Sequence, residues 1–449
     1  MKRNLCAAFL LALAAAGCGS QAPLPLPGIG RPARAGDPFA YVGSRASDFQ
    51  TRAAAGSAQV VFLKSPGGVV QTAARVAAFR SLLERATAGS AIDPNVLEAI
   101  VFLESAGRPD AIAGTDLASA AGLTQILAQT GQSLLGMHVD LRLSRALIAQ
   151  LDAALGVGDP TVVDRLQARL ARVDERFDPL KALRATVRYL QLAQQRFGRV
   201  DLSVESYHMG IGNLQSVLDA YGAGPVPYTQ LFFDSFLDRH PGAFGLLQGF
   251  GDDSRLYWWR VLVCEQIMRL YRDDRGALER WAALETASDS TALVLHPPGS
   301  VAVFADPDAL RVAYARRTVL PLPSNPGALG IAYDPTLRRL YRGLRPAALD
   351  LLIELAARVR AISGSRAPLV IASTVVDKRY QAAAGTPPLS ATGYEFSVAR
   401  RYASRAQAAA FQAMLDRLQA LNVIAWTRTP STIDVTVASD ASKVIVDGP

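Results

Sequence analysis

A clear helical pattern covers residues 92–105, which read IDPNVLEAIVFLES. Asp93 followed by Pro94 is a typical helix start, because an Asp side chain accepts hydrogen bonds from first-turn N–H groups and proline fits the first helical position. The residues that follow are almost all apolar, which predicts a buried helix. Leu97 and Glu104 lie two turns apart on one side, so the carboxylate of Glu104 is expected to project from an apolar face.

Helical spacing recurs through the first two thirds of the chain. It predicts one amphipathic helix over 72–88, a helix over 179–197 and further helices within 231–284. The segment 134–175 is predicted to form two or three helices. The alternating charges of 164–176 are expected to face solvent.

The pattern changes beyond 287–299 (ASDSTALVLHPPG), which is typical of a linker. Beyond this linker helices are predicted at 346–362 and 404–421, and strands at 369–376, 423–426 and 431–438. Helices and strands mixed over some 150 residues favour a separate domain. We therefore predict a multidomain chain in which a mainly α domain is followed by a smaller α+β domain.

Length and charge set limits on the class of protein. At 449 residues the chain is long enough for two or three domains, for which we predict residues 71–286 and 300–449. The net charge of +8 comes mostly from dispersed arginines. Nucleic-acid binding would need clustered basic residues with a recognition motif, and neither is visible.

The first residues are predicted to be a targeting segment. Residues 1–17 combine a positive start, an apolar run and a small-residue ending, which is typical of a signal peptide. The ending Ala-Ala-Gly-Cys resembles a bacterial lipobox, which implies that Cys18 is lipidated and holds the exported protein on the periplasmic face of an outer membrane or the outer face of a cytoplasmic membrane. The alternative is an ordinary secretory signal. Residues 18–70 are predicted to form a proline-rich tether and an N-terminal extension.

Glu104 is the strongest candidate for chemistry. A carboxylate isolated among apolar residues has its pKa raised, and a general acid that works near neutral pH needs such a pKa. The alternative is that Glu104 is a salt-bridged residue of the core.

The surrounding motifs resemble the lysozyme-like, soluble-transglycosylase family of lytic transglycosylases. That family has Glu-Ser at a helix end, then Gly-Leu-Met-Gln, then Ala-Tyr-Asn-Ala-Gly. This chain has Glu104-Ser105, then 122–125 reading GLTQ, then 206–210 reading SYHMG, with 188–190 reading RYL between them. Thr124, His208 and the insertion 134–175 depart from the family pattern.

The resemblance implies a lysozyme-like catalytic domain that cleaves peptidoglycan glycan strands between N-acetylmuramic acid and N-acetylglucosamine. It implies that Glu104 acts as acid and then as base, without a cofactor, and that the products carry 1,6-anhydro ends. The substrate-binding residues that it implies are Ser105, Gln125, Tyr189, Tyr207 and His208.

Two other functions stay open. A hydrolytic muramidase would need a second carboxylate, for which Glu205 is a candidate, although an exposed helix charge is the more common role of such a residue. A peptidoglycan-binding scaffold without catalysis is the other alternative.

The segment 389–402 (LSATGYEFSVARRY) is similar to zinc D-alanyl-D-alanine carboxypeptidases. The positions of that family's zinc ligands fall on Ser390, Ser397 and Asp434. No His follows His296 and no Cys follows residue 264. A catalytic zinc site usually needs about three ligands that include His, so we expect a domain of this kind without a metal site.

Overall fold

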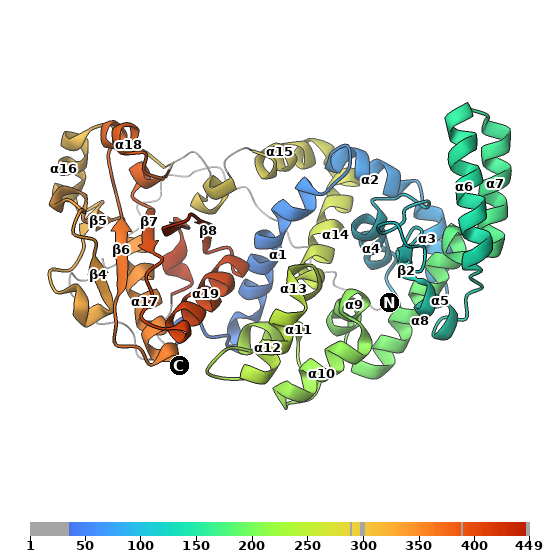
Figure 1. Ribbon diagram of the computed structural model, residues 1–449, viewed down its shortest axis with the longest axis horizontal. Coiled ribbons are helices and arrows are strands. Elements are labelled where there is room, and N and C mark those ends of the chain that lie inside the picture. The colour runs from blue at the N-terminus through green and yellow to red at the C-terminus, as the bar shows by residue number, and fades with distance from the viewer. Residues whose placement is uncertain (1–35, 288–289, 297–300, 388, 446–449) are drawn as a thin grey trace, which may run out of the picture.

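The computed structural model describes residues 36–287, 290–296, 301–387 and 389–445 (Figure 1). The expected signal peptide, Cys18 and the proline-rich stretch lie outside these residues. Helices occupy most of the described chain up to residue 285, and the larger sheet lies in the C-terminal part. The prediction of a mainly α chain with a smaller α+β part at its C-terminal end is therefore confirmed.

Helix α4 (Pro94–Ser105) is at the centre of the helical part. Its start is as predicted, because the Asp93 side chain accepts a hydrogen bond of 2.8 Å from the Asn95 N–H. It ends at Ala106, which has a left-handed backbone (φ 55°). Helix α4 packs against α14 (Tyr257–Asp273), so two helices far apart in the sequence form one wall of the core.

The expected single helix over 72–88 is two helices, α2 (Val69–Ala77) and α3 (Arg80–Thr87). The backbone N–H of Phe79 donates to Val76 O, three residues earlier, which makes a tight turn between them. The bend lets α2 pack against α14 while α3 packs against α8 (Pro179–Phe197). Tertiary packing, which the helical period does not report, decides this break.

Helix α1 (Ala46–Leu63) lies in the extension that the sequence left unplaced. It packs against α14 on one side and against α19 (Arg405–Ala420) on the other. The contact with α19 is close, since a Cβ added at Gly56 would lie 3.0 Å from Gln419 O. Asp37, just before α1, forms an ion pair of 2.8 Å with Arg417 of α19. The extension therefore joins the helical part to the sheet part.

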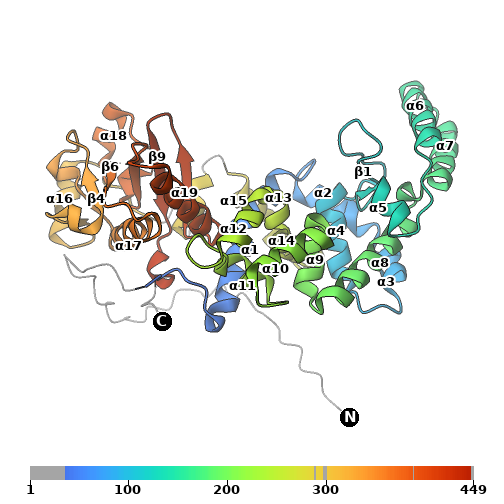
Figure 2. The ribbon, with the colours of Figure 1, turned by 60° about the horizontal axis from the view of Figure 1, so that its bottom comes forward.

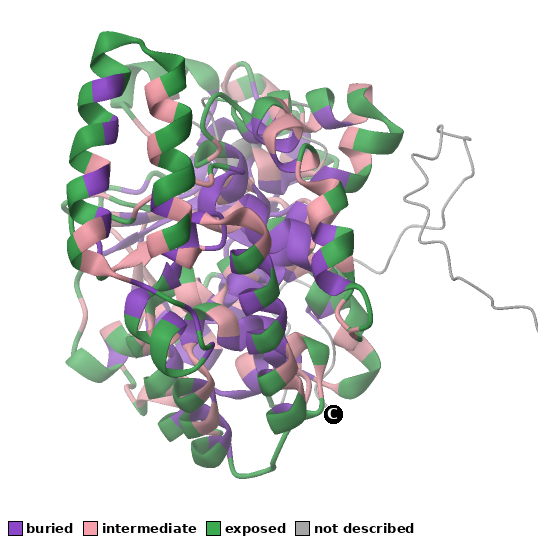
Figure 3. Cartoon of the chain, turned by 90° about the vertical axis from the view of Figure 1, so that its right-hand side faces the viewer, coloured by how far each residue is buried: buried purple, intermediate pink, exposed green. Residues whose placement is uncertain are grey.

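The segment 134–175 is an arm of two antiparallel helices, α6 (Leu141–Val157) and α7 (Pro160–Val173), which projects from one end of the molecule (Figures 1 and 2). Figure 3, which views this end, shows exposed residues over most of the arm and buried residues in the body behind it. The prediction of helices here is confirmed.

The solvent-facing prediction is wrong at the end of the charged stretch. Asp174 and Arg176 are fully buried and form an ion pair of 2.7 Å. The Arg176 guanidinium also donates to the carbonyl oxygens of Leu117 and Ser119, each at 2.9 Å. These bonds satisfy a buried charge and hold the loop that follows α4.

The remaining elements of the helical part are short. They are β1 (Ala120–Ala121), β2 (Ile126–Leu127), α5 (Ala128–Ser133), α9 (Val200–Met209), α10 (Ile211–Tyr221), α11 (Tyr228–Asp234), α12 (Pro241–Gly249), α13 (Gly251–Arg255) and α15 (Arg275–Glu285). Among the described residues, no helix combines the length and the apolar composition needed to cross a membrane.

The C-terminal part is a five-stranded sheet in the order β4-β6-β7-β9-β8. Its strands are β4 (Ile331–Tyr333), β6 (Leu369–Ser373), β7 (Glu395–Ala399), β8 (Ile424–Arg428) and β9 (Thr432–Val437). Helix α17 (Pro346–Ser363) and α19 pack against each other and contact the sheet, where Ile433, Val435 and Val437 of β9 are buried as their alternation predicts. The other elements here are α16 (Pro307–Ala315), α18 (Lys378–Ala384), β3 (Leu320–Pro321) and β5 (Gly343–Leu344).

Candidate active site

Glu104 opens onto a cavity of about 260 Å³. The end of α4 supplies Glu104, Ser105 and Arg108, while His208 comes from α9 and Tyr257 from the first turn of α14. The buried α4–α14 packing therefore fixes the position of the acid, and the end of α4 brings it to the rim of the core. The structure brings Glu104, Ser105 and His208 of the expected site residues into one cavity.

The carboxyl group of Glu104 carries a hydrogen bond from Tyr257, whose hydroxyl donates to Glu104 Oε1 at 2.7 Å. Desolvation by burial raises the pKa of Glu104 to about 7, against the lowering effect of this hydrogen bond. In the described part of the chain the side-chain partner of Glu104 is Tyr257 and not a cation, so Glu104 is not a salt-bridged core residue. A carboxyl group with this pKa holds its proton on a sizeable fraction of molecules at neutral pH.

Tyr257 is a site residue that the sequence did not indicate, because an aromatic run such as Tyr257-Trp258-Trp259 is more often interpreted as part of a core. That interpretation is right for burial, since all three are at most 9 % exposed. Burial and the neighbouring Glu104 hold the pKa of Tyr257 well above its usual value, so its hydroxyl remains a donor. Its position at a helix start is the sequence signal that could have marked it.

His208 lies beside this pair. Its ring stacks on the Tyr257 ring with centroids 5.2 Å apart, and its Nδ1 lies 3.0 Å from Ser254 Oγ. Desolvation lowers the pKa of His208, so the imidazole is neutral near pH 7 and has both a donor and an acceptor nitrogen. Such a ring suits hydrogen bonding to a hydroxyl or an amide.

Charged side chains line the rest of the cavity. Lys64, Arg108 and Arg260 are basic, and Asp253 is acidic. Asp253 pairs with Arg260 at 2.6 Å and with Lys64 at 3.1 Å, and these cations lower its pKa. Basic side chains therefore outnumber acidic ones in the lining around Glu104, which favours an anionic substrate.

Ser105 lines the cavity but does not hold Glu104 through its hydroxyl. It is buried, and its Oγ donates to the carbonyl of Val101 in its own helix at 3.3 Å. This is the usual bond of a serine inside a helix.

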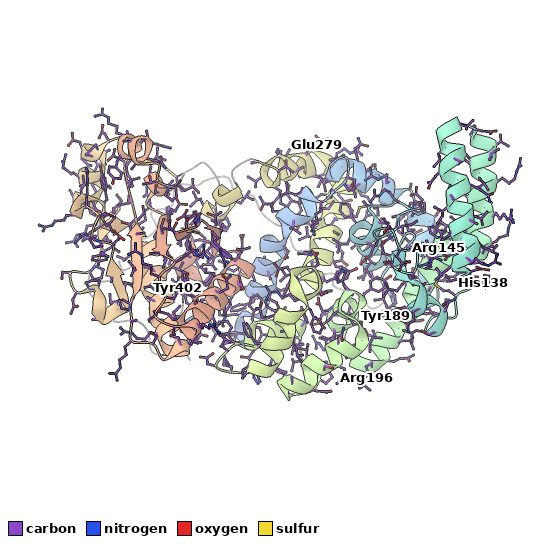
Figure 4. All side chains as sticks on the ribbon, viewed as in Figure 1. His138, Arg145, Tyr189, Arg196, Glu279 and Tyr402 are labelled. Carbon is purple, nitrogen blue, oxygen red and sulfur yellow. The ribbon has the colours of Figure 1, made fainter. Side chains whose placement is uncertain are left out.

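The structure does not place Gln125, Tyr189 or Tyr207 in the lining of this cavity. Gln125 has a left-handed backbone (φ 52°), and its amide nitrogen donates to backbone carbonyls of its own loop at 2.9 and 3.0 Å. Tyr189, labelled in Figure 4, donates to Ser206 O at 2.6 Å. These bonds hold the loop and α9 in place behind the cavity.

The Tyr207 hydroxyl donates to the carbonyl of Thr124 at 2.7 Å. It therefore ties α9 to the GLTQ loop, two of the motifs that the sequence separates by some 80 residues. The centroid of its ring lies 6.4 Å from that of the Tyr257 ring.

Glu205 is not the exposed helix charge that its position suggested. It is fully buried, and one oxygen accepts the Trp258 N–H at 2.8 Å. Burial raises the pKa of Glu205 to about 8. The reason is the packing of α9 against α14, which the helical period does not reveal. Glu205 does not line the Glu104 cavity.

In the C-terminal part, Ser397 of β7 and Asp434 of β9 are directly opposite each other. Ser390 lies in a short turn, where its hydroxyl donates to Pro387 O at 2.7 Å. Across the described residues, no group of three or more His, Cys, Asp or Glu side chains is arranged to hold a metal ion.

No protein-family model, curated protein or solved structure matches the chain. What the cavity can do therefore follows from its own groups. A protonated carboxyl group, a tyrosine that can stabilise the carboxylate formed from it, and a neutral imidazole suit proton transfer to a substrate oxygen.

Proposed function

We propose that this protein is a lytic transglycosylase that cleaves the bond between N-acetylmuramic acid and N-acetylglucosamine in peptidoglycan without using water. The observation that carries the proposal is a single carboxyl group, Glu104, which has a pKa of about 7 and faces an open cavity at the end of a buried helix. The lysozyme-like fold of residues 71–286 is part of the same proposal and is supported by the order of the motifs around the cavity.

In the reaction, Glu104 gives its proton to the glycosidic oxygen as the bond to C1 breaks and positive charge develops on the sugar ring. The Glu104 carboxylate, stabilised by the Tyr257 hydroxyl, then takes the proton of the sugar's own 6-hydroxyl. The 6-oxygen bonds to C1 and closes a 1,6-anhydro ring. The proton from the 6-hydroxyl replaces the one that Glu104 gave to the glycosidic oxygen, so one residue acts as acid and as base.

The partner is the glycan strand itself. Its lactyl and peptide carboxylates complement the positive excess of Lys64, Arg108 and Arg260 along the cavity. His208 can donate to or accept from an N-acetyl or hydroxyl group of the sugar, in place of the Asn of the resembling family.

A hydrolytic muramidase is the second candidate, because another carboxylate, Asp253, lines the same cavity. Retaining and inverting hydrolases use such a second carboxylate as nucleophile or base. Two cations hold Asp253, however, and a carboxylate engaged in this way is a poor nucleophile or base. The geometry therefore favours the transglycosylase over the hydrolase.

The products decide between these functions. Purified peptidoglycan digested with the protein should release fragments with 1,6-anhydro ends, which mass spectrometry detects as lighter by one water than the products of a hydrolase. Asp253→Asn should leave the product type unchanged. Reducing-end products that disappear in Asp253→Asn would assign a muramidase, and no products from any form would assign a binding scaffold.

The proposed location is the surface of a bacterial membrane, with acyl chains on Cys18 as the anchor. Each buried methylene of such a chain contributes about 0.8 kcal/mol to membrane binding. Metabolic labelling with a fatty-acid probe should mark the wild type and not Cys18→Ala. Label that persists in Cys18→Ala would contradict this anchor.

A further inference from the structure

Among the described strands, β8 lies at an edge of the sheet and has no partner strand on its outer side. On its inner side it pairs with β9, with Trp426 opposite Val435 and Thr427 opposite Asp434. The Thr429 N–H donates to Thr432 O, so residues 429 and 432 form a hydrogen-bonded pair. Hydrogen-bonded and non-hydrogen-bonded pairs alternate along an antiparallel ladder, so residues 427 and 425 also bond to β9, and the residues between them do not. Ile424, Trp426 and Arg428 therefore direct their backbone N–H and C=O groups away from β9. Within the described residues these groups have no hydrogen-bond partner.

A cavity of about 570 Å³ lies along this strand, larger than the one at Glu104. Residues 424–427 of β8 line it together with Ala55 and Gln59 of α1 and the end of α15. Figure 1 shows β8 as the strand of the large sheet that lies nearest to α1 and α15. The volume of this cavity is in the range of specific ligand pockets, roughly 300–1,000 Å³.

One carboxyl group, Glu285 at the end of α15, lies in the wall. Glu285 is a buried residue (8 % exposed) whose Oε1 accepts the Trp281 indole N–H at 2.8 Å, while its Oε2 has no hydrogen-bond donor among the described residues. No Lys or Arg lines the cavity within the described chain, and His296 is held by Asp440 and Asn422 at 3.2 Å each. The one acidic group of the wall, without an ionic partner among the described residues, is therefore the carboxyl of Glu285, whose pKa burial raises above its usual value.

We propose that this cavity binds an extended peptide segment that carries a primary amine, and that the segment adds to the sheet as a further strand beside β8. The row of unpaired backbone groups matches the backbone of a peptide, which supplies donors and acceptors at the same spacing. The amine pairs with Glu285 in the wall. β8 offers five residues, about 17 Å of strand, which suits a short peptide segment. This site is separate from the Glu104 cavity and does not depend on glycan cleavage.

The test uses the purified protein and the peptide acetyl-Ala-Val-Lys-Val-Ala-amide. Backbone amide exchange, followed by NMR, should slow at residues 424 and 426 when the peptide binds, and change little at 425 and 427, which already pair with β9. Two N-methylated peptides test the strand pairing, one methylated at residues two and four and the other at residues one, three and five. A strand pairs with β8 through one edge only, so one of these two peptides should lose binding and the other should keep it.

Two substitutions test the wall. Glu285→Gln should weaken binding of the lysine peptide roughly tenfold, because glutamine has no charge to pair with the ammonium group. It should not change the binding of a peptide in which norleucine replaces the lysine. Glu279→Gln is the matched control, since Glu279 is exposed on the same helix (Figure 4). Ala55→Trp, at an exposed position of α1 that lines the cavity, should prevent binding, while Ala146→Trp on the arm should not.

Several results would overturn the proposal. They are the absence of saturable binding, equal effects of the two N-methylated sets, or binding that survives Ala55→Trp. A lysine peptide and a norleucine peptide that bind equally well would overturn the role of Glu285.

Discussion

The helical part and the sheet part each contain a segment that resembles a cell-wall enzyme, but they differ in the side chains at the matched positions. At the Glu104 cavity, the matched carboxyl group is present, is desolvated and has a hydroxyl donor at 2.7 Å. On the sheet, two of the three matched positions carry the hydroxyls of Ser390 and Ser397, and Asp434 is the third. Strands and register can form without the residues that perform a reaction, so a resemblance in sequence does not by itself establish chemistry.

A second comparison lies within the helical part. Glu104 and Glu205 are both desolvated carboxyl groups, with pKa values of about 7 and about 8. Glu104 lines a cavity, whereas Glu205 is sealed between α9 and α14. A raised pKa marks a functional acid only where a substrate can reach it.

The largest effect is expected for Glu104→Gln. The substitution keeps the shape of the side chain and removes the transferable proton, so the rate of glycan cleavage should fall by at least about 10³-fold. Release of soluble fragments from peptidoglycan measures the rate, and circular dichroism checks the fold. Glu205→Gln is the matched control and should keep most of the activity, and a loss as large in Glu205→Gln would contradict the distinction between the two carboxyl groups.

A smaller effect is expected for Tyr257→Phe. Loss of the hydrogen bond that stabilises the Glu104 carboxylate should reduce kcat/KM by about tenfold. It should also raise the pKa of Glu104, so the protonated acid persists and activity falls off at higher pH than in the wild type.

The control for this variant is Tyr271→Phe, on the same helix but outside the cavity. Its pH profile of kcat/KM should match that of the wild type. If Tyr257→Phe lowers kcat/KM without shifting its pH dependence, the tyrosine does not act through the pKa of Glu104.

Glu205→Gln should change the pH dependence of stability. The pKa of Glu205 is raised from 4.5 to about 8 in the folded protein, so its contribution to stability is fully present below about pH 4.5 and is lost as pH rises through about 8. Urea unfolding should therefore show the wild type losing more stability between pH 5 and pH 8 than Glu205→Gln does. Parallel losses in the two proteins would contradict a buried neutral Glu205.

The smallest effect is expected for zinc at the sheet part. Metal analysis of the purified protein should find no stoichiometric zinc, and added zinc or a chelator should leave glycan cleavage unchanged, because the matched positions offer serine hydroxyls that stay protonated near neutral pH. One equivalent of tightly bound zinc would contradict this expectation. The sheet part, like the helical part, would then carry groups suited to catalysis.

The sequence by itself determined the local features of this protein. Asp93 caps α4 as expected, and Asp178 and Ser404 cap α8 and α19 in the same way, because a cap depends on residues two or three positions apart. The alternation of β9 and the apolar face that carries Glu104 were also predictable, since both follow from the period of one element.

Only the tertiary structure decided what those elements meet. Tyr257 lies 153 positions beyond Glu104, and their hydrogen bond exists because α14 packs against α4. The burial of Glu205 and Arg176 and the place of α1 between the two parts likewise depend on distant partners. A helical pattern states which face is apolar but not which surface covers it, and the covering surface sets the pKa, the hydrogen bonds and the access that make a carboxyl group useful.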